Sequence, residues 1–528
     1  MKKNYKTQLN WFLTLISGVL FNLSYPPFNY YPLAYISLVP LFYVLLNSEN
    51  NRTVFLYGAG WGISFNIIYL FWIKIFHILA LPAILFAMAI YYGTLLLITK
   101  ILITKFKRLS YIIVPSVWVS IEYIRSIGFL GFPWGLVYQS QWNFTSLIQI
   151  ASVFGSFFIT YLIILGNFII AKELKNFTDK KKIYLRKVII FTTIIITLAI
   201  WGKFRIKRIE QAYEKSISVR AALIQPSVDP NIPFEKIRYK VLSELTVLSE
   251  KSALYEPDII VWSETAILDY IKYYLKNQEK LKKYDYFQER INYARNVVRL
   301  AKDLNVYLFT GIPDFEKHNN KEFDYNAAVL ISPDGEILDT YRKNHLVPFG
   351  EWFPYNIPII KKILESTFAG NFTPSTRKTV FNMVTKNKNI RFSCLICYEG
   401  VFSDLTRKFV LNGAEFLINI TNDMWSFSEK AEFQHFIADV FRAVENNVAY
   451  IRSANSGVTG IIYPDGKVGK IAPLFKKTFI IADVPVIKNK NYTLYTVLGD
   501  FFPKFLLIFV FILLILVLVN KIKEQKFL

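Results

Sequence analysis

Three side chains with complementary chemistry stand where strand-like runs of the sequence end. Glu264 closes the run DIIVWSE, Lys343 closes GEILDTYRK and Cys397 closes IRFSCLIC. Catalytic groups of α/β domains are often presented at such strand ends. A carboxylate that takes the proton of a thiol, beside an amine that stabilises the thiolate and a tetrahedral oxyanion, would form a nucleophilic site. Spacing alone leaves open the alternative that Glu264 caps a helix and Lys343 is a solvated surface charge.

Both cysteines of the 528-residue chain lie within four positions, as Cys394-Leu-Ile-Cys397. In a strand, residues three apart point to opposite faces of the sheet. This placement disfavours a disulfide, a redox pair and a shared metal ion, and the sequence has no second cysteine pair or histidine cluster to complete a zinc site. We predict that Cys394 is a buried small hydrophobic residue and that Cys397, at the strand end, is the nucleophile.

The composition is typical of a membrane protein. The chain is 53% hydrophobic and contains 46 Phe, 33 Tyr and 10 Trp, more than a soluble domain of this length normally carries. Its net charge of +23 lies mainly outside residues 203–500, because that region holds 41 basic and 34 acidic residues while the rest of the chain holds 21 and 5. A basic surplus that flanks apolar segments is typical of membrane topology, so we expect no nucleic-acid partner.

Eight apolar stretches have the ~20 residues that a membrane-spanning helix needs. Lys and Arg gather before the first stretch and after the second, fourth, sixth and eighth, which predicts that both termini are cytoplasmic. We therefore predict a bundle of seven transmembrane helices over residues 1–202, an extracytoplasmic catalytic domain over 203–503, and an eighth helix with a cytoplasmic tail over 504–528. The eight stretches are residues 9–25, 30–47, 53–76, 78–103, 110–128, 146–171, 186–202 and 504–520.

Residues 203–503 have the pattern of an α/β domain, in which short apolar runs alternate with amphipathic stretches. Helices are predicted at 285–303 and 430–447. Pro-Asp-Gly at 333–335 and again at 464–466 joins two strand-like runs, as a hairpin turn does. The predicted strands are SVRAALIQ, DIIVWSET, VYLFTGI, YNAAVLIS, IRFSCLICYE, EFLINITND, AYIRSAN and TGIIYPDG.

Three sequence motifs resemble the Glu, Lys and Cys signatures of the nitrilase superfamily: WSETA at 262–266, YRKNHLVPFGEWFP at 341–354 and CLICYEG at 394–400. LSYPPFNYYPLAYISLVPL, GAGWGISFNIIYLFWI and EYIRSIGFLGFPWG are similar to segments of its membrane-bound branch, the apolipoprotein N-acyltransferases. The resemblance covers essentially the whole chain. It implies an αββα sandwich domain joined to a bundle of eight transmembrane helices.

The resemblance also implies roles for individual residues. The family's base falls on Glu264, its lysine on Lys343 and its nucleophile on Cys397. Its second glutamate falls on Glu351, which could equally be a salt-bridge partner that orients Lys343. Two further supporting positions follow the nucleophile, namely Tyr398, whose backbone N–H would complete an oxyanion hole, and Glu399, which is as readily structural as catalytic.

The segment NITNDMWSFS resembles a family loop in which Phe-Gly follows Asn, Asp and Trp. Asn422, Asp423 and Trp425 match that loop, and Asn422 and Trp425 are expected to position substrate or the loop itself. Ser426 and Phe427 follow here without the glycine, so the sequence does not fix the path of the loop.

Four other residues are further candidates. Phe234 stands about where the family places a Trp. His435 could be a general base, but a buried packing histidine is the commoner case. Glu122 and Arg125 share a helix face in the fifth apolar stretch, where ionisable groups are costly and often functional; we favour a role in headgroup or loop positioning, and side chains that reach the membrane interface are the alternative.

The implied reaction is ping-pong acyl transfer in the bacterial inner membrane. A membrane phospholipid would donate an acyl chain to Cys397, and the α-amino group of the N-terminal diacylglyceryl cysteine of an apolipoprotein would accept it. The sequence shows no Gly-rich phosphate loop or metal cluster, so we expect no cofactor and no metal, and we expect a monomer. Residues 351–360 are a candidate lid. The alternatives are a membrane-tethered amidase with the same triad and a non-catalytic lipid or lipoprotein binder.

Overall fold

A computed structural model describes residues 2–229, 232–352, 371–488 and 491–526. The chain divides into two compact units. Met1–Ile206 with Leu498–Leu528 form the first, here called the helical unit, and Lys207–Val497 form the second, the α/β unit. Residues 353–360 of the candidate lid lie outside the described residues.

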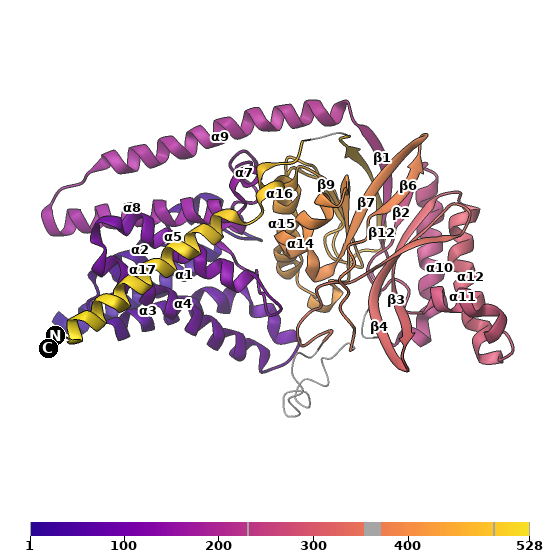
Figure 1. Cartoon of the computed structure of the whole chain (residues 1–528), viewed down its shortest axis with the longest axis horizontal. Helices are drawn as coiled ribbons and strands as arrows, with labels where there is room; N and C mark the ends of the chain where they lie inside the picture. Colours follow the sequence, from indigo (N-terminus) through magenta and orange to yellow (C-terminus); the bar gives the residue numbers. More distant parts are fainter. Residues whose placement is uncertain (1, 230–231, 353–370, 489–490, 527–528) are drawn as a thin grey trace. The chain divides into compact units, whose positions relative to one another are not determined.

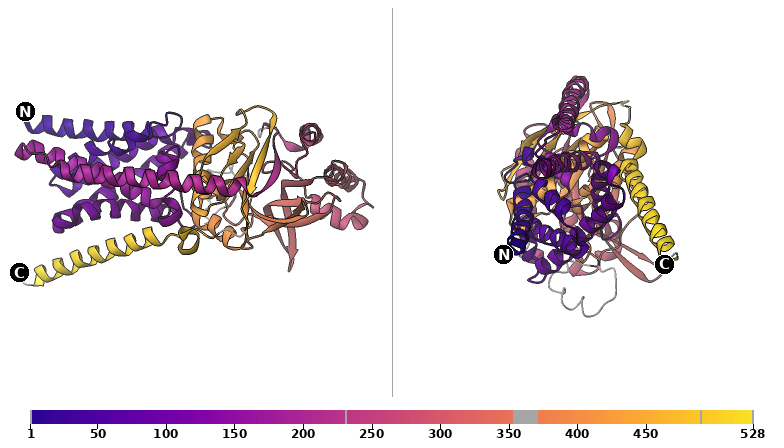
Figure 2. Two further views of the ribbon diagram at one scale, coloured as in Figure 1. Left: turned by 90° about the horizontal axis from the view of Figure 1, so that it is seen from above. Right: turned by 90° about the vertical axis from the view of Figure 1, so that its left-hand side faces the viewer.

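The helical unit consists of α-helices joined by short 3₁₀ turns, and its helices run in roughly the same direction in the left view of Figure 2. The last helix, α17, returns to this unit from the far end of the chain and contacts α4, α5 and α8. The helices are α1 (Lys2–Asn22), α2 (Val39–Asn47), α3 (Asn51–Tyr69), α4 (Ala80–Lys105), α5 (Ser110–Ser126), α6 (Thr145–Ile148), α7 (Ala151–Phe154), α8 (Phe157–Lys180), α9 (Leu185–Glu214) and α17 (Phe501–Lys526), with 3₁₀ helices η1 (Tyr31–Tyr35), η2 (Phe71–Ile75), η3 (Lys107–Leu109) and η4 (Val137–Gln141).

Among the described residues, four helices are long and apolar enough to cross a membrane, namely α4, α8, α9 and α17. The predicted total of eight spans is not confirmed. Residues 30–47, for example, form η1 and the nine-residue α2 instead of one continuous helix. Pro32 and Pro40 lie in the first turns of these two elements, where proline is tolerated but cannot continue a preceding helix. The predicted spans at 53–76 and 110–128 are likewise shorter helices, α3 and α5.

Aromatic packing and small residues hold the bundle together. The indole of Trp61 on α3 lies 4.7 Å from the ring of Tyr92 on α4 and 5.6 Å from that of Trp118 on α5, ring centre to ring centre. A Cβ atom at Gly58 would lie 2.3 Å from the Tyr92 carbonyl oxygen. Glycine therefore allows α3 and α4 to approach backbone to backbone, a packing mode common between membrane helices.

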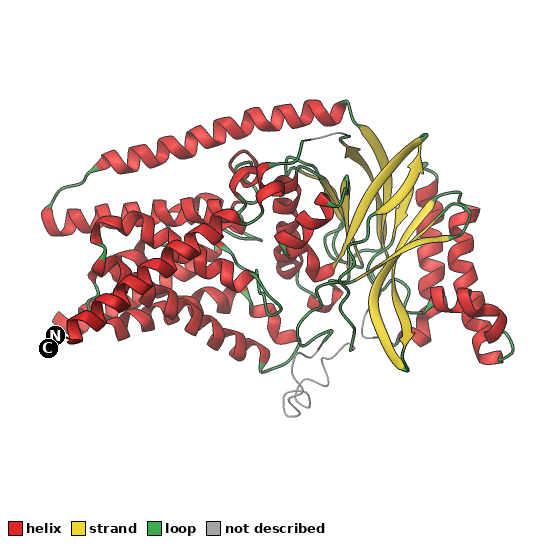
Figure 3. Ribbon diagram, viewed as in Figure 1, coloured by secondary structure: helices red, strands yellow, loops and turns green. Residues whose placement is uncertain are grey.

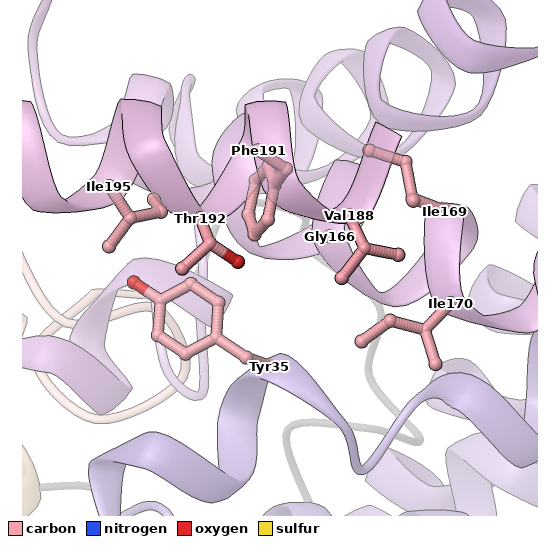
Figure 4. Close-up of a pocket in the computed structure, with 8 residues that line it drawn as sticks. All are labelled: Tyr35, Gly166, Ile169, Ile170, Val188, Phe191, Thr192 and Ile195. Carbon is pink, nitrogen blue, oxygen red and sulfur yellow. The ribbon is translucent and has the colours of Figure 1, made fainter. Parts of the chain in front are cut away.

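A cavity of about 210 Å³ lies between α8 and α9 (Figure 4). Tyr35 and Thr192 point hydroxyl groups toward it, and the other six lining residues, among them Gly166 and Phe191, are apolar. None of the eight lining residues carries an acid, an amine or a thiol. The chemistry predicted from the sequence must therefore lie elsewhere.

The described residues of the α/β unit form two six-stranded mixed sheets, with strand orders β12-β1-β2-β3-β4-β5 and β11-β10-β9-β8-β7-β6. The strands are β1 (Ile217–Gln225), β2 (Ile259–Val261), β3 (Tyr307–His318), β4 (Lys321–Ile331), β5 (Ile337–Arg342), β6 (Phe381–Thr385), β7 (Lys388–Ile396), β8 (Phe416–Thr421), β9 (Ala449–Ala454), β10 (Gly460–Ile462), β11 (Val468–Ile471) and β12 (Thr478–Val486). Both Pro-Asp-Gly segments join antiparallel neighbours, β4 to β5 and β10 to β11, as predicted.

The two sheets pack face to face and helices cover their outer faces (Figures 1 and 3). Between the sheets, Phe309 on β3 lies edge-on to Phe381 on β6 and Phe392 on β7, at 5.1 and 5.4 Å between ring centres. A core that includes Leu245, Tyr274 and Val297 packs three helices on the first sheet. The helices are α10 (Phe234–Ala253), α11 (Ile271–Leu281) and α12 (Asp285–Asp303) on the first sheet, α14 (Ser403–Leu411) and α15 (Glu429–Asn446) on the second, and the short α16 (Leu494–Leu498). The predicted αββα sandwich is confirmed.

Strand direction explains why distant residues can meet. Strands β1, β2 and β3 are parallel, as are β7, β8 and β9. Strand β5 is antiparallel to β4, which is antiparallel to β3, so β5 runs in the direction of β2. Glu264 therefore follows the carboxyl end of β2 and Lys343 that of β5 in one sheet, while Cys397 follows that of β7 in the other.

Candidate active site

A buried ammonium group between two carboxylates is the centre of the site. Lys343, only 1% exposed, places Nζ 2.9 Å from Glu351 Oε1 and 3.4 Å from Glu264 Oε1. Burial by itself lowers the pKa of Lys343, but the carboxylates of Glu351 and Glu264 outweigh it and raise the net pKa above the ordinary value. The side chain is therefore a cation held in place by two anions.

Asn326 on β4 joins the same two carboxylates from the other side. Its Nδ2 donates to Glu264 Oε1 and to Glu351 Oε1, at 2.8 Å each. The backbone carbonyl oxygen of Asn326 accepts a hydrogen bond from the backbone N–H of Lys343 at 2.8 Å, which extends the pairing of β4 and β5 by one residue. Asn326 was not among the residues predicted from the sequence. The available signal was a polar side chain inside the apolar run YNAAVLIS, at a position that the sandwich buries.

Cys397 is the first residue of the 3₁₀ turn η5 (Cys397–Val401), directly after β7, and its φ is +52°. This left-handed conformation is unusual for a residue with a Cβ atom. Burial raises the pKa of the thiol, the charge of Glu264 raises it further, and Lys343 lowers it in part. The thiol is therefore protonated at neutral pH and needs a base before it can act as a nucleophile. Cys394 is fully buried, and both cysteines are free.

Glu399 ties the nucleophile turn to the segment that follows Lys343. It is fully buried, and its carboxylate accepts from the backbone N–H groups of Asn344 at 2.6 Å, His345 at 2.9 Å and Ile396 at 2.8 Å. The hydroxyl of Tyr341 donates to the same carboxylate at 2.8 Å. Burial raises the pKa of Glu399 to about 7, although Lys343 and the backbone donors lower it in part.

The remaining residue of the nucleophile turn that the sequence singled out is Tyr398. The residue is 8% exposed, and its ring packs against Phe402 with 5.1 Å between ring centres. The ring of His345 lies 5.8 Å away on the same basis. This packing fixes the peptide that follows the thiol.

The loop after β8 contributes a backbone donor. The N–H of Asn422 donates to Glu264 Oε2 at 2.9 Å, so Glu264 is held from both sheets. Trp425 lies in the 3₁₀ turn η6 (Met424–Ser426) and is partly exposed. Phe427 ends this turn at a φ of +43°. The loop therefore contains a left-handed backbone conformation at Phe427, although the glycine of the family pattern is absent.

Asp423 belongs to a buried polar cluster beside the nucleophile. Among the described residues, Cys397, Asp423 and His435 each place one ligand-type atom within 4.8 Å of the others. Arg452 Nη2 lies 2.6 Å from Asp423 Oδ2 and 2.8 Å from His435 Nδ1. Because a guanidinium already supplies positive charge there, the group fits a metal cation poorly.

Three further sequence-predicted positions have contacts of their own. Phe234 begins α10 and packs on the outer core of the first sheet. In the helical unit, the Glu122 carboxylate is fully buried and accepts from Val137 N at 3.0 Å and Thr160 Oγ1 at 3.1 Å. Arg125 is 9% exposed and donates to the Trp134 carbonyl at 2.9 Å. Both side chains therefore face the interior of the bundle, where they hold the segment after α5.

Comparisons with known proteins agree with this architecture. Residues 17–169 match the apolipoprotein N-acyltransferase N-terminal domain, and residues 220–488 match the carbon-nitrogen hydrolase family. The chain is 32% identical to apolipoprotein N-acyltransferase 1 of Treponema denticola, covering 98% of both chains, and 30% identical to apolipoprotein N-acyltransferase of Geobacter metallireducens, covering 93% of this chain and 92% of the relative. It is also similar to a solved carbon-nitrogen hydrolase from Helicobacter pylori G27, with 18% identity, a TM-score of 0.36, and coverage of 51% of this chain and 89% of that chain. From the two domain matches and the near full-length similarity, the chain belongs to the apolipoprotein N-acyltransferase family.

Proposed function

We propose that this acyltransferase works by a ping-pong mechanism in which a membrane phospholipid acylates Cys397. Glu264 accepts the thiol proton, and the thiolate attacks an ester carbonyl of the lipid. The Lys343 ammonium and the backbone N–H of Tyr398 stabilise the oxyanion. The ester C–O bond then breaks, and the lysophospholipid leaves with the proton that Glu264 received. The product is a thioester on Cys397.

In the second half-reaction the same groups act, and the sulfur of Cys397 is now the leaving group. The α-amino group of the N-terminal diacylglyceryl cysteine of an apolipoprotein attacks the thioester carbonyl. The C–S bond breaks, the amine nitrogen loses a proton to Glu264, and that proton returns to the sulfur. An amide bond to the lipoprotein replaces the thioester, and the free thiol is restored.

The observation that carries this proposal is the buried Lys343, held between Glu264 and Glu351 beside a thiol whose charge it stabilises. A cation that is already oriented and desolvated costs little reorganisation when an oxyanion forms. Glu351 is proposed to orient Lys343, since the Nζ to Oε1 distance is 2.9 Å.

The membrane location is part of the proposal. Both substrates carry acyl chains, and extracting such a chain into water would cost roughly 0.8 kcal/mol per methylene group. An enzyme that stays in the bilayer avoids that cost. We propose that the α/β unit lies on the outer side of the bacterial inner membrane with both termini in the cytoplasm, as the distribution of Lys and Arg predicts, and that the enzyme is monomeric.

Intact-mass spectrometry of the full chain incubated with phospholipid that carries labelled acyl chains tests this mechanism. The wild type should gain one labelled acyl group, and Cys397→Ala should gain none. Hydroxylamine should remove the adduct, because it cleaves thioesters. A wild type without any adduct would contradict the acyl-enzyme. Rapid cleavage of small amides without an acyl adduct would instead support a membrane-tethered amidase with the same triad.

A further inference from the structure

The carbonyl oxygen of the nucleophile accepts two side-chain hydrogen bonds. Asn419 Nδ2 on β8 lies 3.2 Å from the Cys397 oxygen, and His435 Nε2 on α15 also lies 3.2 Å from it. Cys397 has a left-handed backbone, which is unfavourable for a residue with a Cβ atom and persists only where the surroundings hold it. The two donors act on the carbonyl of that same residue.

The proton on His435 Nε2 follows from the chemistry of its partner. A carbonyl oxygen only accepts, so this ring nitrogen must donate. The other nitrogen, Nδ1, lies 2.9 Å from Asp423 Oδ1 and 2.8 Å from Arg452 Nη2. A neutral ring accepts from Arg452 and a protonated ring donates to Asp423. Nε2 carries its proton in both states, so the bond to Cys397 is independent of the charge on the ring.

A buried charge network holds the ring in place. Arg452 is fully buried in β9 and pairs with Asp423 at 2.6 Å and with Asp439 of α15 at 2.7 Å. The ring of His435 is 2% exposed. Glu432 lies one turn earlier on α15 and accepts from Ser426 Oγ at 2.6 Å. The imidazole is therefore fixed by charges on three elements, α15, β9 and the loop after β8.

The turn itself packs tightly on this network. A Cβ atom at Gly400 would lie 2.6 Å from Asn419 Nδ2 and 2.6 Å from Asp439 Oδ1. Only a glycine allows the third residue after Cys397 to come so close to the polar groups behind it. The nucleophile turn therefore packs on a buried polar surface, and Asn419 and His435 are the two side chains of that surface that reach the Cys397 carbonyl.

We propose that His435 is a positioning residue, which fixes the left-handed backbone of Cys397 through its Nε2–H and thereby aims the thiol. It is neither the base nor a metal ligand. This inference rests on the proposed acyl-enzyme mechanism and adds a residue to it. A shift of about 1 Å in a reacting group can lower a rate a hundredfold, so loss of this hydrogen bond should slow acylation without weakening lipid binding.

Two substitutions separate this role from general base catalysis. His435→Gln places an amide N–H near the position of Nε2, and His435→Asn reaches only the position of Nδ1. Neither amide can act as a base. If His435 positions Cys397, glutamine restores activity and asparagine does not; if His435 is a base, both fail equally. His318→Asn, at an exposed site at the end of β3, is the matched control.

The test is the rate of thioester formation on Cys397 in the full chain, measured by mass against phospholipid concentration. We expect the maximal rate of His435→Asn to fall tenfold to a hundredfold, with half-saturation within twofold of wild type. His435→Gln should recover to within about threefold, and His318→Asn should match wild type. Wild-type rates in His435→Asn, or equal losses in both variants, would overturn the proposal.

A second variant and a second readout guard against misfolding. Asn419→Ser removes the other donor to the Cys397 carbonyl and should lower the maximal rate in the same way. An unchanged rate would contradict the proposal that hydrogen bonds to this carbonyl position Cys397. Alkylation of Cys397 by iodoacetamide over a range of pH needs no lipid. Its pH profile should change in His435→Asn but not in His435→Gln. If the wild type forms no thioester, the proposed mechanism fails, while this alkylation profile still tests the positioning role.

Discussion

At the scale of single residues, two opposite charges act on the pKa of the Cys397 thiol. Glu264 raises its pKa and Lys343 lowers it. Lys343→Gln should therefore move the alkylation of Cys397 to higher pH, because the thiolate loses a stabilising cation, and Glu264→Gln should move it to lower pH. The rate of iodoacetamide labelling of the Cys397 peptide measures both, with exposed Lys321→Gln as the control. Shifts in the same direction would contradict this electrostatic account.

Asn326 leads to a second prediction at this scale. Its amide donates to two carboxylates that both contact Lys343. Asn326→Asp puts a third acid at the same place, so Glu264 and Glu351 lose a donor and gain a repulsive neighbour. We expect thioester formation to fall by more than tenfold.

The control for this substitution is Asn320→Asp, which makes the same change at an exposed turn residue with a φ of +59°. Aspartate tolerates that conformation nearly as well as asparagine. Full activity in Asn326→Asp would show that the amide is not needed to hold the two carboxylates.

The residue types that carry the chemistry could be predicted from the sequence, since each follows an apolar run that ends abruptly. The contacts between them could not. Asn326, Asn419 and Arg452 act on partners distant in the chain, and each lies inside a strand-like run where a polar residue gives no sign of its partner. His435 was expected to be a packing histidine, and the structure does bury it, but its bond to the nucleophile depends on how α15 sits against β7 and β8.

At the scale of elements, strand β3 supports the base. A Cβ atom at Gly311 would lie 2.6 Å from the backbone N of Thr265 and 2.8 Å from the Cα of Glu264. Because backbone atoms cannot move aside as a flexible side chain can, Gly311→Ala must displace Glu264. We expect acylation of Cys397 to fall at least tenfold while the chain still folds.

Gly469→Ala on β11 is a matched control, since its added methyl group would meet only side-chain atoms of Ile461 and Tyr463. Melting temperatures of both variants in detergent separate a loss of fold from a loss of alignment. Normal acylation in Gly311→Ala would mean that the position of Glu264 is not set by this strand.

Long, strongly patterned elements were predicted well. α12 (Asp285–Asp303) coincides with the predicted helix, and the strands with continuous apolar runs were all found. Strands β6 and β12 were not among the predicted strands, and β11 was expected only as the strand-like run after the Pro-Asp-Gly at 464–466. β6 and β11 are short edge strands, and their identity depends on the neighbour that they pair with. Membrane spans were harder, because Pro40 and the 3₁₀ turns divide apolar stretches that hydropathy alone treats as continuous.

At the scale of the whole molecule, the distribution of Lys and Arg predicts which parts face the cytoplasm. The test uses inner-membrane vesicles of native orientation and a chain that carries Cys394→Ala and Cys397→Ala. In intact vesicles, a cysteine that replaces Asn320 should react with a membrane-impermeant maleimide. A cysteine that replaces Asp179 should react only after the membrane is opened. Asp179 lies in the last turn of α8 and Asn320 lies in an exposed turn of the α/β unit. A cysteine at Lys523 should behave like the one at Asp179. The opposite labelling pattern would contradict the proposed topology.

The pairing of β1 with β12 has a consequence for how the protein is made. Ile217 on the first strand of the α/β unit is the partner of Val486 on its last strand. At a synthesis rate of about 5–20 residues per second, these roughly 270 residues leave the ribosome over roughly 15–50 s. Throughout that interval the growing chain carries an unpaired β1 edge, which only the arrival of the final strand closes. Nascent chains that stall before Thr478 should therefore be the ones that chaperones and proteases of the compartment recognise.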